Sequence, residues 1–237
     1  MNRKKGMITA PKIYKMRIAF TVAGPWDHKR IFAALRQAVL QSALPFERAK
    51  VNPNWPRLAY GPVLGYGQYS LGEYADLYFS SPVKEDEALA ALNRAAPQGV
   101  HLLRALRVPY ALPSVPQLAE VMQYGVEGDF SSLQPLAPAQ DFFAAKHIYV
   151  TEQAPNGMSL QQDLRPYILR VRQPQPEKLE LLLQRCADKT AKPEYVVAAW
   201  LGQPVQTQEQ FTLKNFKFTR EALYWRDAEQ NLHPVQP

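Results

Sequence analysis

The order of apolar patterns in residues 14–108 is the feature that most constrains the fold of this chain. A segment in which every second residue is apolar predicts a half-buried strand, and apolar residues spaced by about four predict a helix with one buried face. The predicted order is strand, helix, strand, strand, helix, strand, over Tyr14–Phe20, Asp27–Ala43, Arg57–Leu64, Gly72–Ser80, Lys84–Ala96 and Val100–Val108. This order is typical of the split βαβ arrangement of ferredoxin-like domains.

Three prolines within Pro109–Pro116 predict a boundary between two halves, because proline interrupts both helices and strands. Beyond the boundary a similar order, with an insertion, is predicted over Leu118–Val126, Ala137–Lys146, His147–Thr151, Pro166–Arg172, Lys178–Arg185, Pro193–Leu201 and Lys214–Trp225. The expected fold is α+β, with two tandem ferredoxin-like lobes and mainly antiparallel sheets. The expected division is a basic tail at 1–13, domains at 14–112 and 117–226, and a loose polar tail at 227–237.

The single cysteine, Cys186, limits the chemistry that the chain can perform alone. One thiol cannot form an internal disulfide, and it cannot hold an iron–sulfur cluster, which takes several cysteine thiolates. No apolar run approaches the ~20 residues of a membrane-spanning helix. No apolar core follows the basic first residues, so they do not form a secretory signal. We therefore expect a cytoplasmic protein with no membrane segment and no cofactor of its own.

Positive charge is concentrated in the first quarter of the chain. Residues 1–57 contain twelve Lys and Arg against two acids, whereas the remaining residues contain sixteen against nineteen. Such asymmetry indicates an anionic partner near the N-terminal part, with nucleic acid favoured over a membrane surface. The alternative interpretation is a solvated basic face that has no partner.

The sequence contains none of the common catalytic motifs. It has no phosphate-binding GxxxxGK loop, no HExxH and no GxSxG. The four histidines are far apart in sequence, so only the fold could assemble a metal site from them. We therefore assign no catalytic residue and no metal site.

A stretch of bases and aromatic residues from Arg48 to Tyr69 is the best candidate for a functional surface. Bases contact phosphates, and aromatic rings stack on unpaired nucleobases. Two further bases on the preceding helix are seven residues apart and so share one helix face. The expected nucleic-acid-binding residues are Lys29, Arg36, Arg48, Lys50, Trp55, Arg57 and Tyr66. In the alternative interpretation the tyrosines pack the sheet and Trp55 fills the loop.

Three other charged residues are candidates for a ligand or a structural role. Asp76 and Glu73 lie on opposite faces of one predicted strand, so they do not form an acid–base pair. Asp163 and Arg165 lie at the entrance of another strand, where they either pair with each other or contact a ligand. For Asp163 and Arg165 a structural ion pair is the favoured interpretation.

Several short motifs follow one another in a distinctive order. They are a helix ending in Leu44-Pro45, then Asn52-Pro53 with Pro56, Gly72-Glu73-Tyr74-Ala75-Asp76, Asp163-Leu164-Arg165-Pro166-Tyr167-Ile168 and Lys192-Pro193-Glu194. In this order the chain resembles the radical SAM-linked protein family, from Tyr14 to about Tyr224. It departs from that family's pattern at Pro25-Trp26-Asp27-His28, at Lys50-Val51 and at Trp55-Pro56. The resemblance implies a radical SAM protein as partner.

These observations favour a non-catalytic accessory protein of a radical SAM enzyme. It would bind RNA, or present an RNA or protein substrate, and the partner would perform the chemistry. One alternative is a stand-alone RNA-modifying enzyme that uses a carboxylate such as Asp76 or Asp163. Another is a protein–protein adaptor without a nucleic-acid ligand.

Overall fold

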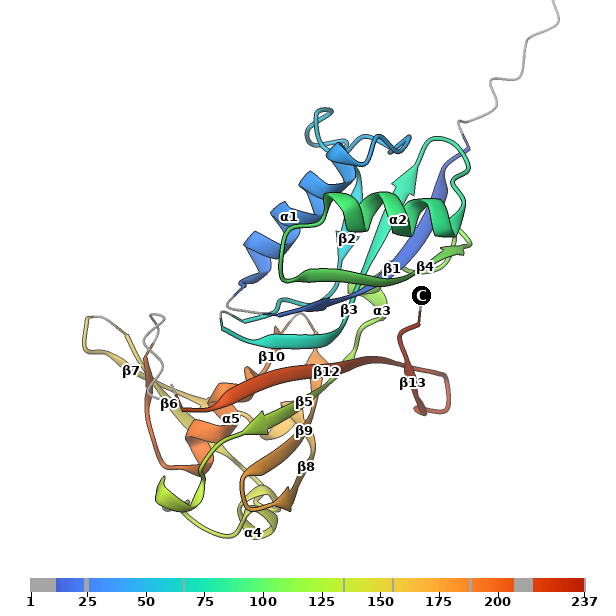
Figure 1. Ribbon diagram of the computed structural model, residues 1–237. Coiled ribbons are helices and arrows are strands. Elements are labelled where there is room, and N and C mark those ends of the chain that lie inside the picture. Colours follow the sequence, from blue (N-terminus) through green and yellow to red (C-terminus); the bar gives the residue numbers. More distant parts are fainter. Residues whose placement is uncertain are drawn as a thin grey trace, which may run out of the picture.

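Most strands of the described chain form one large, mostly antiparallel sheet, so the protein is α+β (Figure 1). The computed structural model describes residues 12–23, 26–65, 67–133, 135–154, 156–187, 189–206 and 215–236. The strand order in the large sheet is β10-β9-β5-β12-β3-β1-β4, and β2, β8 and β13 pair with β3, β9 and β12. A second, three-stranded sheet has the order β11-β6-β7. Most of the predicted basic tail, residues 1–11, lies outside the described residues.

The first half contains the six predicted elements in the predicted order. They are β1 (Tyr14–Val22), α1 (His28–Gln41), β2 (Leu58–Tyr60), β3 (Tyr69–Phe79), α2 (Glu85–Ala95) and β4 (Val100–Val108). Asp27 begins α1 as its N-cap, because its side chain accepts a hydrogen bond from the amide of Arg30 at 2.7 Å. Strand β1 lies between β3 and β4 and is antiparallel to both.

One face of the first-half strands packs against α1 and α2. The apolar stripe of α1, with Ile31, Leu35 and Val39, joins alternate residues of β1 and β3 in one buried cluster. The other face of these strands is covered by the segment 109–119, which contains α3 (Val115–Leu118). Figure 1 shows α1 and α2 on one side of the sheet and α3 on the other.

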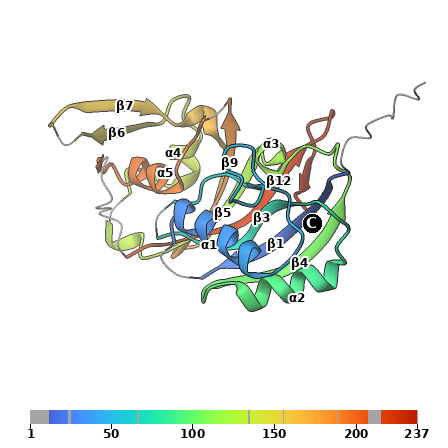
Figure 2. The ribbon, with the colours of Figure 1, turned by 90° about the horizontal axis from the view of Figure 1, so that it is seen from above.

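The second half supplies the remaining elements. They are β5 (Val121–Glu127), η1 (Ser131–Leu133), α4 (Ala139–Phe143), β6 (Tyr149–Gln153), β7 (Ser159–Asp163), η2 (Arg165–Tyr167), β8 (Ile168–Gln175), β9 (Lys178–Cys186), β10 (Lys189–Thr190), α5 (Pro193–Trp200), β11 (Val205–Gln206), β12 (Lys217–Arg226) and β13 (Leu232–Pro234). The predicted hairpin of β8 and β9 and the predicted helix α5 are present. Seen from above, the β6–β7 hairpin extends from this half on the side away from α2 (Figure 2).

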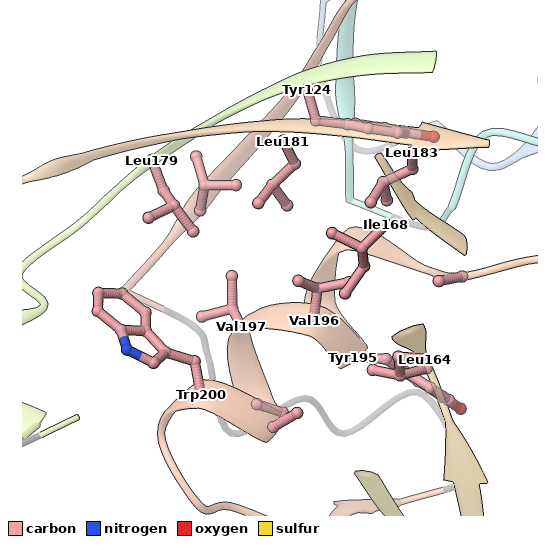
Figure 3. Close-up of a cluster of buried hydrophobic side chains, with 14 of the residues drawn as sticks. Tyr124, Leu164, Ile168, Leu179, Leu181, Leu183, Tyr195, Val196, Val197 and Trp200 are labelled. Carbon is pink, nitrogen blue, oxygen red and sulfur yellow. The ribbon is translucent and has the colours of Figure 1, made fainter. Parts of the chain in front are cut away.

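A second buried cluster lies between β9 and α5. Leu179, Leu181 and Leu183 alternate on β9 and face the side of α5; Leu179 and Leu181 lie over Val197 and Trp200, and Leu183 lies beside Ile168 (Figure 3). Every residue of α5 is buried, and Glu194 is its one charged side chain. The ring nitrogen of Trp200 donates to the carbonyl of Ala137 at 2.8 Å, which satisfies the one polar atom of that large side chain.

The expectation of two separate lobes is not confirmed, because β12 of the second half pairs with β3 of the first. The pairing is parallel and short, with Thr219 opposite Tyr69 and Arg220 opposite Ser70. A glycine permits this close approach, since a Cβ atom on Gly72 would lie 2.7 Å from the carbonyl oxygen of Glu221. The sheet is therefore continuous across both halves and partly parallel.

Two segments depart from the sequence-based expectation. Residues 227–236, expected to be loose, contain β13, which pairs with β12, and Val235 beyond it is buried. Strand β7 was not predicted, because its sequence of Ser, Leu, Gln, Gln and Asp has little β propensity. Within the described part of the chain, no helix has the length and apolar character needed to cross a membrane.

Candidate nucleic-acid interface

Residues 46–57 form a tight loop against the edge of the sheet. Arg48 and Pro56 face each other across an isolated antiparallel bridge. At the tip, the amide of Trp55 donates to the carbonyl of Asn52 at 3.0 Å, which closes the turn that proline and asparagine favour. The Trp55 side chain is 40% exposed, so it does not fill the core.

Planar side chains stack in a continuous column along α1. His28, Phe32 and Arg36 are spaced by four residues and so lie on one helix face. The His28 ring is centred 4.5 Å from the ring of Tyr60 and 6.4 Å from that of Phe32. The guanidinium carbon of Arg36 lies 4.6 Å from the Phe32 ring centre and 3.8 Å from that of Trp55. The stacked column thus runs from the buried ring of Tyr60 to the exposed ring of Trp55.

Four cations lie on α1 and the loop 46–57, the two segments that carry the stacked column. Lys29, Arg48 and Lys50 are exposed, and Arg36 is half-buried beneath Trp55. Within the described ranges, none of the four is in ion-pair contact with a carboxylate. We call Lys29, Arg36, Arg48, Lys50 and Trp55 the α1–loop surface.

Two of the predicted residues do not belong to the α1–loop surface. Arg57 lies over the ring of Tyr78 at 4.1 Å and that of Tyr110 at 5.6 Å, on the sheet face opposite α1. It also donates to the hydroxyl of Tyr110 at 3.2 Å. Tyr66 lies outside the described residues.

A buried ion pair joins the two halves below the stacked column. The Nε of Arg220 lies 2.6 Å from one carboxylate oxygen of Glu73, and its terminal nitrogen lies 2.6 Å from the other. Both side chains have no exposed surface. Arg220 also donates to the carbonyls of Pro62 and Val63, each at 3.0 Å. This pair has a structural role, because all its polar atoms face partners inside the protein.

Several buried polar atoms in the stacked column and beside this junction have no hydrogen-bond partner among the described residues. They include Nδ1 of His28, Nε of Arg36 and Oε2 of Glu194. Burial, together with the positive charge of Arg220, lowers the pKa of His28, so this ring is neutral at neutral pH. Burial raises the pKa of Glu194, although a hydrogen bond from Gln68 opposes the shift. His28 and Arg36 therefore retain hydrogen-bonding capacity within the stacked column.

Asp76 is the centre of a second buried ion cluster. Its carboxylate accepts bonds from Arg17 at 2.8 and 3.2 Å and from the amide of Val115 at 3.0 Å. Lys15 lies 3.3 Å away and donates to the carbonyls of the segment that crosses beneath the sheet. Asp76 and Glu73 do lie on opposite faces of β3, as the strand period predicts, and Asp76 binds the segment after β4 to the sheet.

Asp163 and Arg165 do not bond to each other through their side chains. Asp163 accepts from the ring of His147 at 2.8 Å and from the backbone amides of Ile148 and Arg165. Burial alone would raise the pKa of Asp163, but the bonds from His147, Arg165 and Ile148 together outweigh it, so the pKa is lowered. Arg165 donates to the carbonyl of Ile168 at 2.6 Å. Both residues organise the turn η2. Within the residues that the structure describes, no three His, Cys, Asp or Glu side chains gather as metal ligands would.

Sequence reasoning did not find the central residues of this region. His28 and Phe32 continue the spacing of Arg36 along α1, and this four-residue repeat is a signal that the sequence contains. Arg220 had no such signal, since its partner Glu73 is 147 residues away in the chain. Arg30 was also not predicted. In the structure its guanidinium carbon lies 5.2 Å from the centre of the Trp26 ring.

A family model described as an uncharacterized protein conserved in bacteria (DUF2344) matches residues 17–193. The chain belongs to this family. No curated protein matches the chain. The DUF2344 match includes α1, the loop 46–57 and both buried carboxylates of β3, and it ends before β12, which supplies Arg220.

Proposed function

We propose that this DUF2344 protein binds single-stranded RNA through the α1–loop surface, as a non-catalytic accessory protein. The supporting observation is the exposed ring of Trp55, stacked on Arg36. The exposed Lys29, Arg48 and Lys50 lie on the same two segments, α1 and the loop 46–57, and have no ion-pair partners among the described residues. Unpaired cations contact phosphates without first breaking a salt bridge. The outer face of Trp55 stacks on an unpaired base.

The chemistry belongs, in this proposal, to a radical SAM protein that receives the bound RNA. Support comes from the motif order that resembles the radical SAM-linked family and from the single cysteine, which cannot hold a cluster. Asp76 is a poor candidate for catalysis in this chain, because it is fully buried and its oxygens already accept hydrogen bonds. The carboxylate of Asp163 is likewise engaged by His147 and two backbone amides.

A protein adaptor without nucleic acid is the second candidate. The observation that favours it is the β6–β7 hairpin, where Met158 and Leu160 are each 66% exposed. Exposed apolar side chains on an extended hairpin are typical of protein contacts. The RNA titration below distinguishes the two functions.

We expect RNA affinity to fall steeply with salt. Each phosphate contact on a single strand contributes a log–log slope of about −0.7, so four contacts give about −3, or roughly sevenfold weaker binding per doubling of salt. Lys50→Ala should make the slope shallower by about 0.7, the contribution of one phosphate contact. Lys146 is an exposed lysine of the second half, and Lys146→Ala should leave the slope unchanged. Fluorescence titrations of a labelled single strand at several salt concentrations measure this. A flat salt response of the wild-type protein would favour the adaptor.

Trp55→Ala in the same titration separates stacking from charge. It should weaken binding by about 1 to 3 kcal/mol without changing the salt slope. The melting temperature should change little, because the ring lies outside both buried clusters. A large drop in melting temperature with unchanged RNA affinity would mean that Trp55 only fixes the loop.

The partner assignment has its own test. Co-expression with a radical SAM protein from the same cell, followed by size-exclusion chromatography, should give one co-eluting complex. Clean separation of the two proteins at micromolar concentration would count against the assignment. The double variant Met158→Ser with Leu160→Ser is the comparison for this complex. It changes the exposed hairpin on which the adaptor alternative depends and leaves the α1–loop surface intact.

A further inference from the structure

A pocket on the sheet face opposite α1 has the chemistry of an anion site. It has a volume of about 540 Å³ and is lined by Arg57, Tyr78, Tyr110, Ser114, Gln117 and residues 111–113. The volume falls in the usual range for small-molecule sites, and it is larger than a lone phosphate requires. We call it the Arg57 pocket.

The guanidinium of Arg57 is held in place without being neutralised. The ring of Tyr78 lies 4.1 Å from its central carbon, and Tyr110 accepts a hydrogen bond from one terminal nitrogen at 3.2 Å. No carboxylate lines the pocket, and within the described ranges none forms an ion pair with Arg57. Stacking on two rings orients the guanidinium, while its remaining N–H groups stay available to a ligand.

The wall of the pocket adds donors rather than acceptors. The amide and the hydroxyl of Ser114 both donate to Oε1 of Gln117, at 2.9 and 2.8 Å. The Nε2 group of Gln117 is therefore on the side away from Ser114, and it has no hydrogen-bond partner among the described residues. The hydroxyl of Tyr110 accepts from Arg57 and so keeps its own proton for donation. The carbonyls of Leu112 and Pro113 already accept from Lys15 and therefore offer little to a ligand.

The buried cluster behind this wall is also positive. Lys15 and Arg17 share the single carboxylate of Asp76, which leaves one positive charge in excess. Because this cluster is buried, solvent screens its field less than that of a surface pair. Two positive charges, three donors and no acid together select an anion.

We propose that the Arg57 pocket binds the phosphate of a nucleotide. The phosphate contacts Arg57, Gln117 and the Tyr110 hydroxyl, and the base stacks on the ring of Tyr110, which is 51% exposed. The nucleotide is either free or the 5′-terminal residue of an RNA strand. The site does not depend on RNA binding at the α1–loop surface, from which it is separated by the sheet.

Calorimetric titration of the full chain with AMP, and with adenosine as the ligand lacking phosphate, tests this proposal. AMP should bind at least tenfold more tightly than adenosine. Gln117→Glu is the informative variant, since Glu preserves the bond from the Ser114 amide but replaces the free donors with a charged oxygen. It should weaken AMP binding at least tenfold with an unchanged melting temperature, and Arg57→Gln should do the same.

Control ligands and variants complete the test. Lys50→Ala should leave AMP affinity unchanged, so failure of the α1–loop surface and failure of the pocket give different results. If the protein prefers a 5′-phosphorylated oligonucleotide to a 5′-hydroxyl one, and Gln117→Glu abolishes this preference, the ligand is an RNA end. If the two oligonucleotides bind equally and AMP binding is retained, the ligand is a free nucleotide. Equal affinity for AMP and adenosine, or wild-type AMP affinity in both pocket variants, would overturn the proposal.

Discussion

Replacing Arg220 with Met is expected to lower the free energy of unfolding by about 3 to 5 kcal/mol, because the carboxylate of Glu73 stays buried without its charged partner. The carbonyls of Pro62 and Val63 lose their donors in the same variant. Urea denaturation of the full chain, followed by circular dichroism, measures the change.

Two further variants test whether the buried charge causes this loss. Adding Glu73→Gln to the Arg220→Met background removes the unpaired charge, so part of the lost stability should return. Arg94→Met changes an exposed arginine in the last turn of α2 and should alter stability by no more than about 0.5 kcal/mol. A loss below about 1 kcal/mol for Arg220→Met would contradict the burial of this pair.

Asp76→Asn is expected to lower the free energy of unfolding by a similar amount, because it leaves buried positive charge, instead of buried negative charge, without a partner. The substitution keeps the shape of the side chain but leaves Lys15 and Arg17, both almost fully buried, without a negative partner. Removing one partner of a buried ionic cluster costs about 3 to 5 kcal/mol. Thermal and urea unfolding should both show the loss.

An exposed aspartate provides the matched control for this variant. Asp86 is exposed in the first turn of α2, where its charge is favourable to the helix dipole, so Asp86→Asn should cost about 0.3 to 1 kcal/mol. Equal effects of the two substitutions would mean that water reaches Asp76. Protease digestion should also cut the segment 109–119 faster in Asp76→Asn, because Asp76 accepts the amide of Val115.

Local patterns predicted the elements of the first half but could not predict how the halves join. The split βαβ order follows from apolar spacing and from the capping residue Asp27, which act within a few residues. The junction depends instead on two residue pairs between β3 and β12, and nothing near Arg220 in the sequence marks its partner. Long-range pairing between short segments leaves no periodic signal, which is why two separate lobes were expected.

The candidate surface was predictable in composition but not in arrangement. Clustered bases and aromatic residues identified Lys29, Arg36, Arg48, Lys50 and Trp55 from the sequence. Arg57 was grouped with them because it is close in sequence, yet the turn at Pro56 and the start of β2 direct it to the opposite sheet face. The roles of Tyr110 and Gln117 depend on the path of the segment after β4, which no local pattern encodes.

The position of β12 near the end of the described chain affects how the protein is made. Glu73 is synthesised 147 residues before Arg220, a delay of roughly 7 to 30 s at ordinary rates of translation. During that interval the first part of β3 has an open edge beside an uncompensated carboxylate, and open edges pair readily with other chains. The newborn chain is therefore exposed to aggregation until β12 is synthesised, and slower translation lengthens this interval.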